Sequence, residues 1–460
     1  MHIMYLPRHI DNALLAWKNS SLRKPLLLRG ARQVGKSSSV RHLGETFEFF
    51  VEANFEKTPE LKSLFEYSDV HLIAEHLSAF FQTPVVPGKT LVFLDEIQAC
   101  PAAIKKLWFF KEDYPELHVI AAGSLLEFAL QELSGYGVGR VRSLFMYPLS
   151  FDEFLLAQDK GGWIEEKQAA SPEAPLFEAL HKELQQQFRT FMIVGGMPAS
   201  VRTWIESKDF NNCADELEDI QHSYYEDFAK YARNVDPYLL RSTLHSVVMQ
   251  IGKKFVYSKV GANFRIEEVK KAISLLVDAG IIKVVRHSAG TGIPLGAEVN
   301  EKFLKYLYLD SGLLLRILDL ELGGADDIRR LILLESEEEL VNKGGITEMV
   351  VGWELVKYST ARTQYDLYYW ENLDRGTTAE VDYLLARNLK VVPMEIKSGV
   401  SGKMKSLRMF MNRRDLDLGI RSSLENFGKL SVSDNENCKE RTIEIVPLYA
   451  LSNLFPISTT

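Results

Sequence analysis

Near its start, this chain of 460 residues places a glycine-rich octet between a short apolar strand and a helix. Leu26–Arg29 is typical of a strand buried in a sheet, and a helical pattern begins at Lys36. The octet fits the pattern G-x-x-x-x-G-K-[ST], whose glycines and backbone amides wrap phosphate groups at a helix start. It predicts an ATP phosphate site in which Lys36 reaches the β- and γ-phosphates and Ser37 binds Mg²⁺. The residues expected to line this site are Gly30, Ala31, Arg32, Gln33, Val34, Gly35, Lys36, Ser37 and Ser38.

Two further apolar strands end in polar residues that suit the same site. Thr90–Leu94 runs into Asp95 and Glu96, and His118–Ala122 runs towards Ser124. Asp95 is expected to hold Mg²⁺ through water, and Glu96 to polarise the attacking water, a role that a mere binding module does not need. A side chain at Ser124 would sense the γ-phosphate. These residues predict an ATPase.

Composition supports a folded, globular chain. The chain is 46% hydrophobic and 25% charged, which excludes a largely disordered polymer. No apolar run approaches the ~18 residues of a membrane span, and no signal peptide is evident at the start. The three cysteines are too far apart for a disulfide framework or a zinc site. We therefore expect a cytoplasmic protein without a membrane partner.

Short motifs along the chain agree with one known group. They are Tyr5-Leu6-Pro7-Arg8, Leu28–Lys36, Leu94–Gln98, Gly123-Ser124, Gly139-Arg140-Val141, Pro148–Phe154, Gly195-Gly196-Met197-Pro198 and Tyr308–Leu314. Together they resemble prokaryotic AAA-type ATPases with a C-terminal domain of unknown function 4143. The resemblance implies ATP and Mg²⁺ as cofactors, a winged-helix middle and a nuclease-like C-terminal fold. It also makes Arg140 a candidate phosphate-sensing or finger arginine, a surface arginine being the alternative, and a homo-oligomer is one possible state.

The predicted fold class follows from these patterns. An AAA-type α/β P-loop NTPase domain, a parallel sheet with flanking helices, is expected at residues 1–158. A glycine- and proline-containing loop is expected at 159–175, and a helical connecting region at 176–238. A winged-helix domain at 239–320 and an α/β restriction-endonuclease-like domain at 340–455 complete the chain.

The middle domain has the pattern of two helices followed by a strand pair. The helices are expected at Leu239–Gly252 and Ile266–Asp278, the strands at Ile281–Val285 and Leu304–Leu309. Residues 236–310 hold eleven basic and seven acidic residues, although the whole chain carries a net charge of −8. Two readings stay open. The domain contacts double-stranded DNA through lysines on phosphates, or it is a rigid spacer, because two glutamates open its second helix.

Residues 380–397 read as a β-hairpin that turns at Asn388-Leu389. In that register Asp382 faces Glu395 across the hairpin, and Glu380 faces Lys397. Facing carboxylates repel each other unless a cation lies between them.

The hairpin resembles the active site of PD-(D/E)xK nucleases. The resemblance makes Asp382 and Glu395 ligands of Mg²⁺ or Mn²⁺, and Lys397 the activator of the attacking water. Glu348 in the preceding helix is the first candidate for a further ligand, and Glu354 the second. The alternative is a relic nuclease fold or a plain ion-paired hairpin. A basic helix face downstream has the same two readings, phosphate binding or solvation; its residues are Lys403, Lys405, Arg408, Arg413 and Arg414.

Two functions from different classes remain. In the first, the protein is a Mg²⁺-dependent ATPase that acts on DNA, with Lys397 and Glu395 supporting strand cleavage. In the second, it is a nucleotide-dependent switch or assembly ATPase of signalling or defence type, whose C-terminal fold binds without cleaving.

Overall fold

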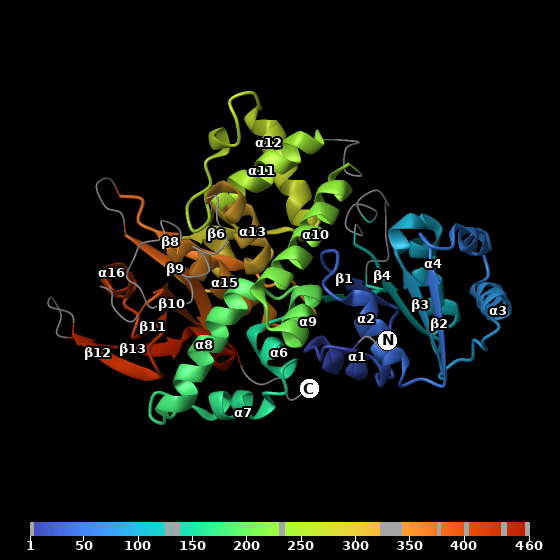
Figure 1. The fold of residues 1–460 in the computed structure, drawn as a ribbon, viewed down its shortest axis with the longest axis horizontal. Helices are drawn as coiled ribbons and strands as arrows, with labels where there is room; N and C mark the ends of the chain where they lie inside the picture. The colour runs from blue at the N-terminus through green and yellow to red at the C-terminus, as the bar shows by residue number, and fades with distance from the viewer. Residues whose placement is uncertain are drawn as a thin grey trace.

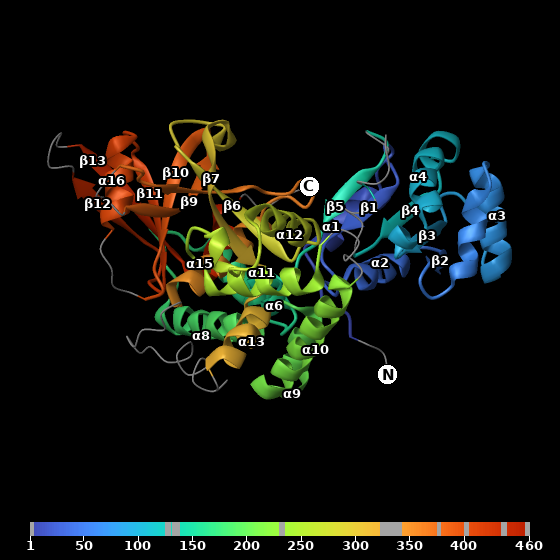
Figure 2. The ribbon, with the colours of Figure 1, turned by 90° about the horizontal axis from the view of Figure 1, so that it is seen from above.

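A computed structural model describes residues 4–124, 130, 139–229, 235–322, 343–374, 379–399, 404–433 and 439–455. Lys403 and Cys438 lie outside these ranges. Figures 1 and 2 show an N-terminal α/β unit at one end, a C-terminal sheet at the other, and helices between them. Within the described residues, no helix combines the length and apolar character needed to cross a bilayer.

The N-terminal unit is built on a five-stranded sheet in the order β2-β3-β4-β1-β5. All neighbouring strands are parallel, as expected from their short apolar runs. The strands are β1 (Leu26–Arg29), β2 (Phe49–Asn54), β3 (Thr90–Asp95), β4 (His118–Ala122) and β5 (Arg142–Phe145). Its helices are α1 (Ile10–Lys18), α2 (Lys36–Gly44), α3 (Val70–Phe81) and α4 (Pro101–Asp113). Every residue of β3 and β4 is buried, so the carboxyl ends of the central strands form a rigid platform.

Helices link this unit to the rest of the chain. They are α6 (Phe151–Leu156), α7 (Gly161–Ala169), α8 (Glu178–Val194), α9 (Pro198–Ser207) and α10 (Phe210–Phe228). The loop predicted over 159–175 is wrong for much of its length, because α7 lies within it. Lys167 explains the difference: its ammonium is buried against Asp152 and donates to Ser452 Oγ at 2.7 Å. Ser452 is distant from Lys167 in the sequence, so a prediction from local glycine and proline residues cannot take this contact into account.

The next segment has the expected order of helices followed by a strand pair. The elements are α11 (Pro237–Met249), α12 (Ile266–Asp278), β6 (Ile282–Ser288), β7 (Val299–Tyr308) and α13 (Ser311–Leu322). The boundaries of α12 coincide with the predicted ones. The antiparallel pair β6–β7 does not stand alone, because β6 also pairs in parallel with β8 (Leu367–Glu371).

The C-terminal part therefore shares its sheet with the middle segment. The sheet has eight strands in the order β12-β13-β11-β10-β9-β8-β6-β7. The remaining elements are α15 (Lys343–Lys357), β9 (Glu380–Arg387), β10 (Lys390–Ile396), α16 (Lys405–Arg413), β11 (Leu418–Ser423), β12 (Gly428–Ser433) and β13 (Glu440–Pro447). Short 3₁₀ segments are Pro59–Glu66, Ile97–Ala99, Tyr257–Lys259, Leu295–Glu298 and Leu448–Leu454. Thus the ranges 239–320 and 340–455 are joined by main-chain hydrogen bonds.

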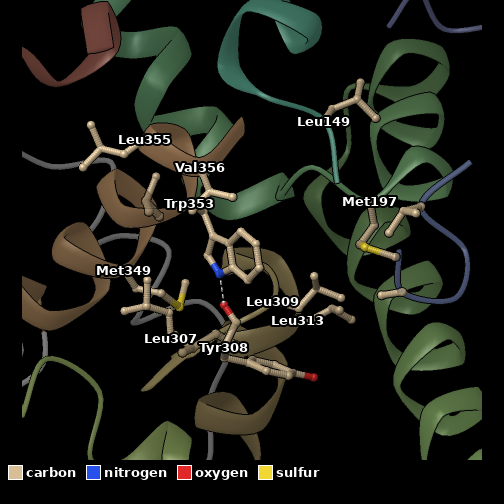
Figure 3. Close-up of a cluster of buried hydrophobic side chains, with 14 of the residues drawn as sticks. Leu149, Met197, Leu307, Tyr308, Leu309, Leu313, Met349, Trp353, Leu355 and Val356 are labelled. Carbon is tan, nitrogen blue, oxygen red and sulfur yellow. Dashed lines mark hydrogen bonds between the residues drawn. The ribbon is translucent and has the colours of Figure 1, made fainter. Parts of the chain in front are cut away.

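One apolar core includes residues from Leu6 to Leu451 and connects the parts. Figure 3 shows a portion of this core around Trp353. At its centre Trp353 of α15 is buried and donates its indole N–H to the carbonyl oxygen of Tyr308 at 2.6 Å. Leu149 and Met197, from segments that border the N-terminal unit, belong to the same cluster. A second core fills the opposite face of the five-stranded sheet beneath α3 and α4.

Candidate nucleotide site and a buried acidic cluster

The loop between β1 and α2 has the backbone that its glycines predict. Gly30 has φ +147°, and a Cβ there would lie 2.1 Å from the carbonyl oxygen of Met146. Gly35 has φ +99°. The ammonium of Lys36 donates to the carbonyl oxygens of Gly30 and Ala31 at 2.9 and 2.7 Å. Burial lowers the pKa of Lys36 to about 8. The Lys36 side chain thus lies across the loop, with its ammonium next to the loop's first two residues.

The structure brings Ser37 and Asp95 together, as a Mg²⁺ site of this type requires. Ser37 Oγ lies 3.1 Å from Asp95 Oδ1. Asn54 at the end of the neighbouring strand donates to Asp95 Oδ2 at 3.0 Å. Burial, reinforced by the nearby Glu96 charge, raises the pKa of Asp95. Sequence reasoning missed Asn54, whose only signal is its place beside Asp95 in the parallel register.

Glu96 and Ser124 follow the ends of β3 and β4, the strand next to β1. Glu96 has φ +49°, and its Oε2 accepts from Gln98 Nε2 at 2.6 Å. Gly123 makes room for this amide, since a Cβ there would lie 2.0 Å from Gln98 Oε1. Ser124 lines a cavity together with Gly30 and Ala31. These side chains therefore gather at the same edge of the sheet.

Two loop residues turn their side chains towards α10. Arg32 Nη1 binds both carboxylate oxygens of Asp227 at 2.6 and 2.7 Å. Gln33 donates to Ser223 Oγ at 2.9 Å, and the hydroxyl of Tyr224 donates to the carbonyl oxygen of Arg32 at 2.7 Å. The side chains of Arg32 and Gln33 are thus engaged by a helix, and their backbone forms part of the loop.

Arg8 holds the opposite side of the loop in place. The sequence contains it in the motif Tyr5-Leu6-Pro7-Arg8 but does not indicate this role. Its guanidinium donates to the carbonyl oxygens of Val34 and Tyr147 at 2.8 and 2.7 Å. It also pairs with Glu153 at 3.1 Å. Burial opposes the charge on Glu153, but the charge of Arg8 and hydrogen bonds outweigh it and lower its pKa to about 2.

An open cavity of about 530 Å³ lies beside the start of α2. Gly35, Ser38 and Ser39 line it from the loop and helix, and Arg202 lines it from α9. The ring of Tyr5 stacks on His42, which also lines the cavity, with centroids 4.0 Å apart. Its size, and aromatic rings next to a phosphate loop, suit a nucleoside.

Family models match three stretches of the chain. A model described as AAA domain matches residues 22–155, which hold the loop, Asp95 and Glu96. The chain carries an AAA domain. Domain of unknown function 8612 matches residues 185–322, and domain of unknown function 4143 matches residues 343–451. The combination matches an AAA-type ATPase with a C-terminal domain of unknown function 4143, which confirms the resemblance found in the motifs.

Two solved structures are distantly similar to this chain. The Walker-type ATPase PABY2304 of Pyrococcus abyssi is 15% identical with a TM-score of 0.43, over 68% of this chain and 96% of that chain. The Aeropyrum pernix Orc1 protein in complex with DNA is 13% identical with a TM-score of 0.27, over 69% and 92%. No curated protein matches.

Arg140 lies on the surface of the AAA domain. Its guanidinium stacks over the ring of Trp108 in α4 at 3.8 Å and pairs with Glu112 at 3.2 Å. These contacts hold it against α4, and a finger role towards a neighbouring subunit stays a prediction.

The predicted hairpin register is confirmed from Lys390 opposite Arg387 to Met394 opposite Tyr383. Asn388 and Leu389 form its turn with φ +49° and +59°. The two predicted carboxylates there have separate partners. Asp382 Oδ2 accepts from the backbone N–H of Ile396 at 2.6 Å, and Glu395 Oε1 accepts from Lys397 Nζ at 2.6 Å.

A lysine from β7 enters this acidic region, and sequence reasoning missed it. Lys305 is buried and donates to Glu348 Oε1 at 2.8 Å and Glu380 Oε1 at 2.5 Å. Carboxylate oxygens of Glu348, Glu380 and Asp382 lie within 4.8 Å of one another. The structure thus groups Glu348 and Asp382 with Glu380, and Glu395 lies outside that set of three. We call these four carboxylates with Lys305 and Lys397 the acidic cluster.

The acidic cluster holds four carboxylates against two ammonium groups in a buried place, so it would carry excess negative charge if every carboxylate were ionised. Burial raises the pKa of Asp382, Glu348 and Glu395, which favours their neutral forms in the absence of a cation. The nearby carboxylates keep the pKa of Lys305 well above its usual range despite burial. Glu395 Oε2 is buried and has no hydrogen-bond partner among the described residues. A cation would satisfy both the charge and this oxygen.

Other predicted residues fall elsewhere. Glu354 accepts from the backbone N–H of Phe151 at 2.8 Å and pairs with Lys357 at 3.0 Å, so its carboxylate supports α6 rather than the acidic cluster. Arg413 of α16 pairs with Asp374 at 3.1 Å, and Arg414, the residue after α16, donates to the carbonyl oxygen of Ala289 at 2.7 Å.

Proposed function

We propose that this protein is a Mg²⁺-dependent ATPase whose nucleotide state is transmitted from the AAA domain to the middle and C-terminal parts. The observation that carries the proposal is the meeting of Lys36, Ser37 and Asp95, with Glu96 following β3 directly. In this proposal Ser37 Oγ and Asp95 hold Mg²⁺, directly or through water. Bound Mg²⁺ would neutralise charge on the β- and γ-phosphates.

The chain's own residues supply binding and base chemistry. Lys36 exchanges its two carbonyl partners for phosphate oxygens, and backbone amides of the loop bind the remaining charge. Glu96 accepts a proton from the attacking water through the oxygen that Gln98 leaves free. The cavity beside Tyr5 and His42 takes the nucleoside, so its aromatic rings favour a base over an unsubstituted triphosphate.

Transmission is supported by contacts that the loop makes outside the AAA domain. The bidentate pair between Arg32 and Asp227 ties the loop to α10, and Asp227 is almost fully buried. Displacement of the loop on nucleotide binding would therefore pull on α10. We propose the segment 239–320 as a winged helix, supported by its two helices and strand pair. Its basic residues do not all face solvent, since Lys305 is buried in the acidic cluster.

ATP binding and hydrolysis test the proposal with two variants. Lys36→Ala removes the main countercharge for phosphate and should abolish ATP binding. Glu96→Gln should keep binding and lose turnover by at least a hundredfold, the scale of a general base. Lys57→Ala, at an exposed site of the AAA domain, is the control. Wild-type ATP affinity in K36A would overturn the phosphate-site assignment, and unchanged turnover in E96Q would remove Glu96 from the base role.

A second candidate function is metal-dependent cleavage of double-stranded DNA by the C-terminal part. It is supported by Glu395 Oε2, which has no hydrogen-bond partner among the described residues, and by four carboxylates that, when ionised, outnumber two ammonium groups by the charge of a divalent cation. Asp382, Glu395 and Glu348 would hold Mg²⁺, and Lys397 would orient water. The position of Lys305 argues against a metal ion there, because its ammonium already donates to both Glu348 and Glu380.

Cleavage of a supercoiled plasmid separates the two functions. Wild type is compared with Lys397→Ala and with Lys390→Ala, which changes an exposed lysine of the same hairpin. Nicking in Mn²⁺ that is lost only in K397A supports the nuclease. No nicking by any of the three, with ATP hydrolysis intact, leaves the nucleotide-dependent switch as the function.

A further inference from the structure

A cavity of about 120 Å³ separates the phosphate loop from the middle segment. Gly30, Ala31 and Ser124 line it on the AAA side, and Asp278, Lys283 and Arg286 line it on the other. The two sides come close nearby: a Cβ on Gly280, which lies two residues after α12 and has φ +71°, would be 3.4 Å from the backbone nitrogen of Ala31. The segment that contains β6 therefore borders the nucleotide site within one chain.

The two loop residues that line the cavity, Gly30 and Ala31, are also the ones that hold Lys36. Lys36 donates to the carbonyl oxygens of Gly30 and Ala31, and the lysine of such a loop reaches the β- and γ-phosphates of a bound nucleotide. Ser124, at the carboxyl end of β4, lines the same space. A terminal phosphate bound at this loop would consequently face the cavity.

Two polar groups in the cavity make no hydrogen bond to any of the described residues. Lys283 makes no hydrogen bond or ion pair within the described ranges, whereas its neighbour Arg286 pairs with Asp366 at 3.1 Å. The hydroxyl of Tyr147 is buried and has no hydrogen-bond partner in the part of the chain that the structure describes. Burial lowers the pKa of Lys283, which shows that its ammonium is held partly out of water. An anion that enters the cavity beside Lys283 would supply the ion pair that Asp278 and Asp366, which also line the cavity, do not make with it.

We propose that Lys283 binds the γ-phosphate and lets the middle segment distinguish a nucleoside triphosphate from a diphosphate. The proposal rests on the proposed function, because it requires nucleotide at the loop. Loss of the γ-phosphate removes the partner of Lys283 and weakens the contact between β6 and the AAA domain. By linkage, docking of β6 strengthens triphosphate binding by the same factor.

Nucleotide affinities measured with fluorescent ATPγS and fluorescent ADP test the proposal. Lys283→Met and Lys283→Gln remove the charge, and Lys283→Arg keeps it. Lys271→Met makes the same change at an exposed site of α12. We expect K283M and K283Q to bind ATPγS about tenfold more weakly, the loss of one charge-assisted hydrogen bond, with ADP affinity unchanged. K283R should keep most of the preference, and K271M should match wild type.

Three results would overturn the proposal, and they differ in meaning. An unchanged ratio of ATPγS to ADP affinity in K283M and K283Q removes Lys283 from the γ-phosphate. Equal weakening of both nucleotides makes Lys283 a structural residue. Wild-type protein that binds neither nucleotide would defeat the proposed function itself, and the inference with it.

Discussion

Replacing Lys305 by methionine removes a buried ammonium and keeps the length of the side chain. In wild type this group binds Glu348 at 2.8 Å and Glu380 at 2.5 Å, and its side chain is only 1% exposed. The variant would leave two carboxylates without their cation beside Asp382. We expect a local loss of stability around β7, β9 and α15.

The magnitude follows from burial. The Glu348 side chain is 8% exposed, so breaking that pair falls in the range of about 3–5 kcal/mol for a buried charge left alone. Glu380 is 33% exposed, and solvent reduces its share to about 1 kcal/mol or less. The expected loss is therefore about 4 kcal/mol. The double variant with Glu348→Gln should recover roughly half of it, because the stranded charge is then gone.

Peptide-resolved hydrogen exchange measures this change where it occurs. Amides of Val299–Tyr308 and Glu380–Arg387 should exchange faster in K305M by a factor that corresponds to the lost stability, while β1 and β4 stay protected. Lys302→Met, at an exposed position of the same strand, is the control and should exchange like wild type. Equal protection of β7 and β9 in K305M and wild type would refute the view that Lys305 neutralises the acidic cluster.

Two further perturbations have expected outcomes of their own. The ring of His118 is buried, which lowers its pKa to about 4 from 6.5, so stability present above pH 6.5 should fall by up to about 3 kcal/mol as the pH drops towards 4. Urea midpoints at pH 7 and pH 4.5 should show this loss in wild type and a smaller one in His118→Gln; parallel profiles would contradict the assignment. Gly195 has φ +73°, and a Cβ there would lie 2.2 Å from Asp310 Oδ1, so Gly195→Ala should cost roughly 3 kcal/mol or more in a thermal melt. Gly162→Ala, where a Cβ meets nothing within 4 Å, should melt like wild type or above it, and similar melts for both alanine variants would contradict the argument.

Local signals predicted the parts of this structure that local chemistry determines. The helix Ile266–Asp278 is framed by charged residues at its start and a glycine just after its end, and its bounds agree with the prediction. The hairpin register follows from strict alternation and a two-residue turn at Asn388-Leu389. The phosphate loop and Asp95 also carry strong sequence signals, and the structure brings Ser37 Oγ to 3.1 Å from Asp95 Oδ1.

Contacts between residues that are far apart in the sequence could not be predicted from it. Lys305 is one of the eleven basic residues of 236–310, and the sequence does not indicate its acidic partner Glu380, which lies 75 residues away. The helix Gly161–Ala169 depends on the buried contacts of Lys167, which outweigh two glycines at its start. The contacts of Arg8 with the carbonyl oxygens of Val34 and Tyr147 are likewise long-range, so its sequence motif does not indicate that it holds the loop.

The sheet that β6 shares with β8 has a practical consequence for dissecting the protein. Val285, Arg286 and His287 form a parallel ladder with Leu367, Tyr368 and Tyr369. A truncated chain that ends near residue 322, where one family match stops, would open that side of β6 and expose a strand edge with apolar neighbours. Such a fragment should aggregate or recruit a foreign strand. The cooperative folding unit therefore crosses the boundary between the two family matches.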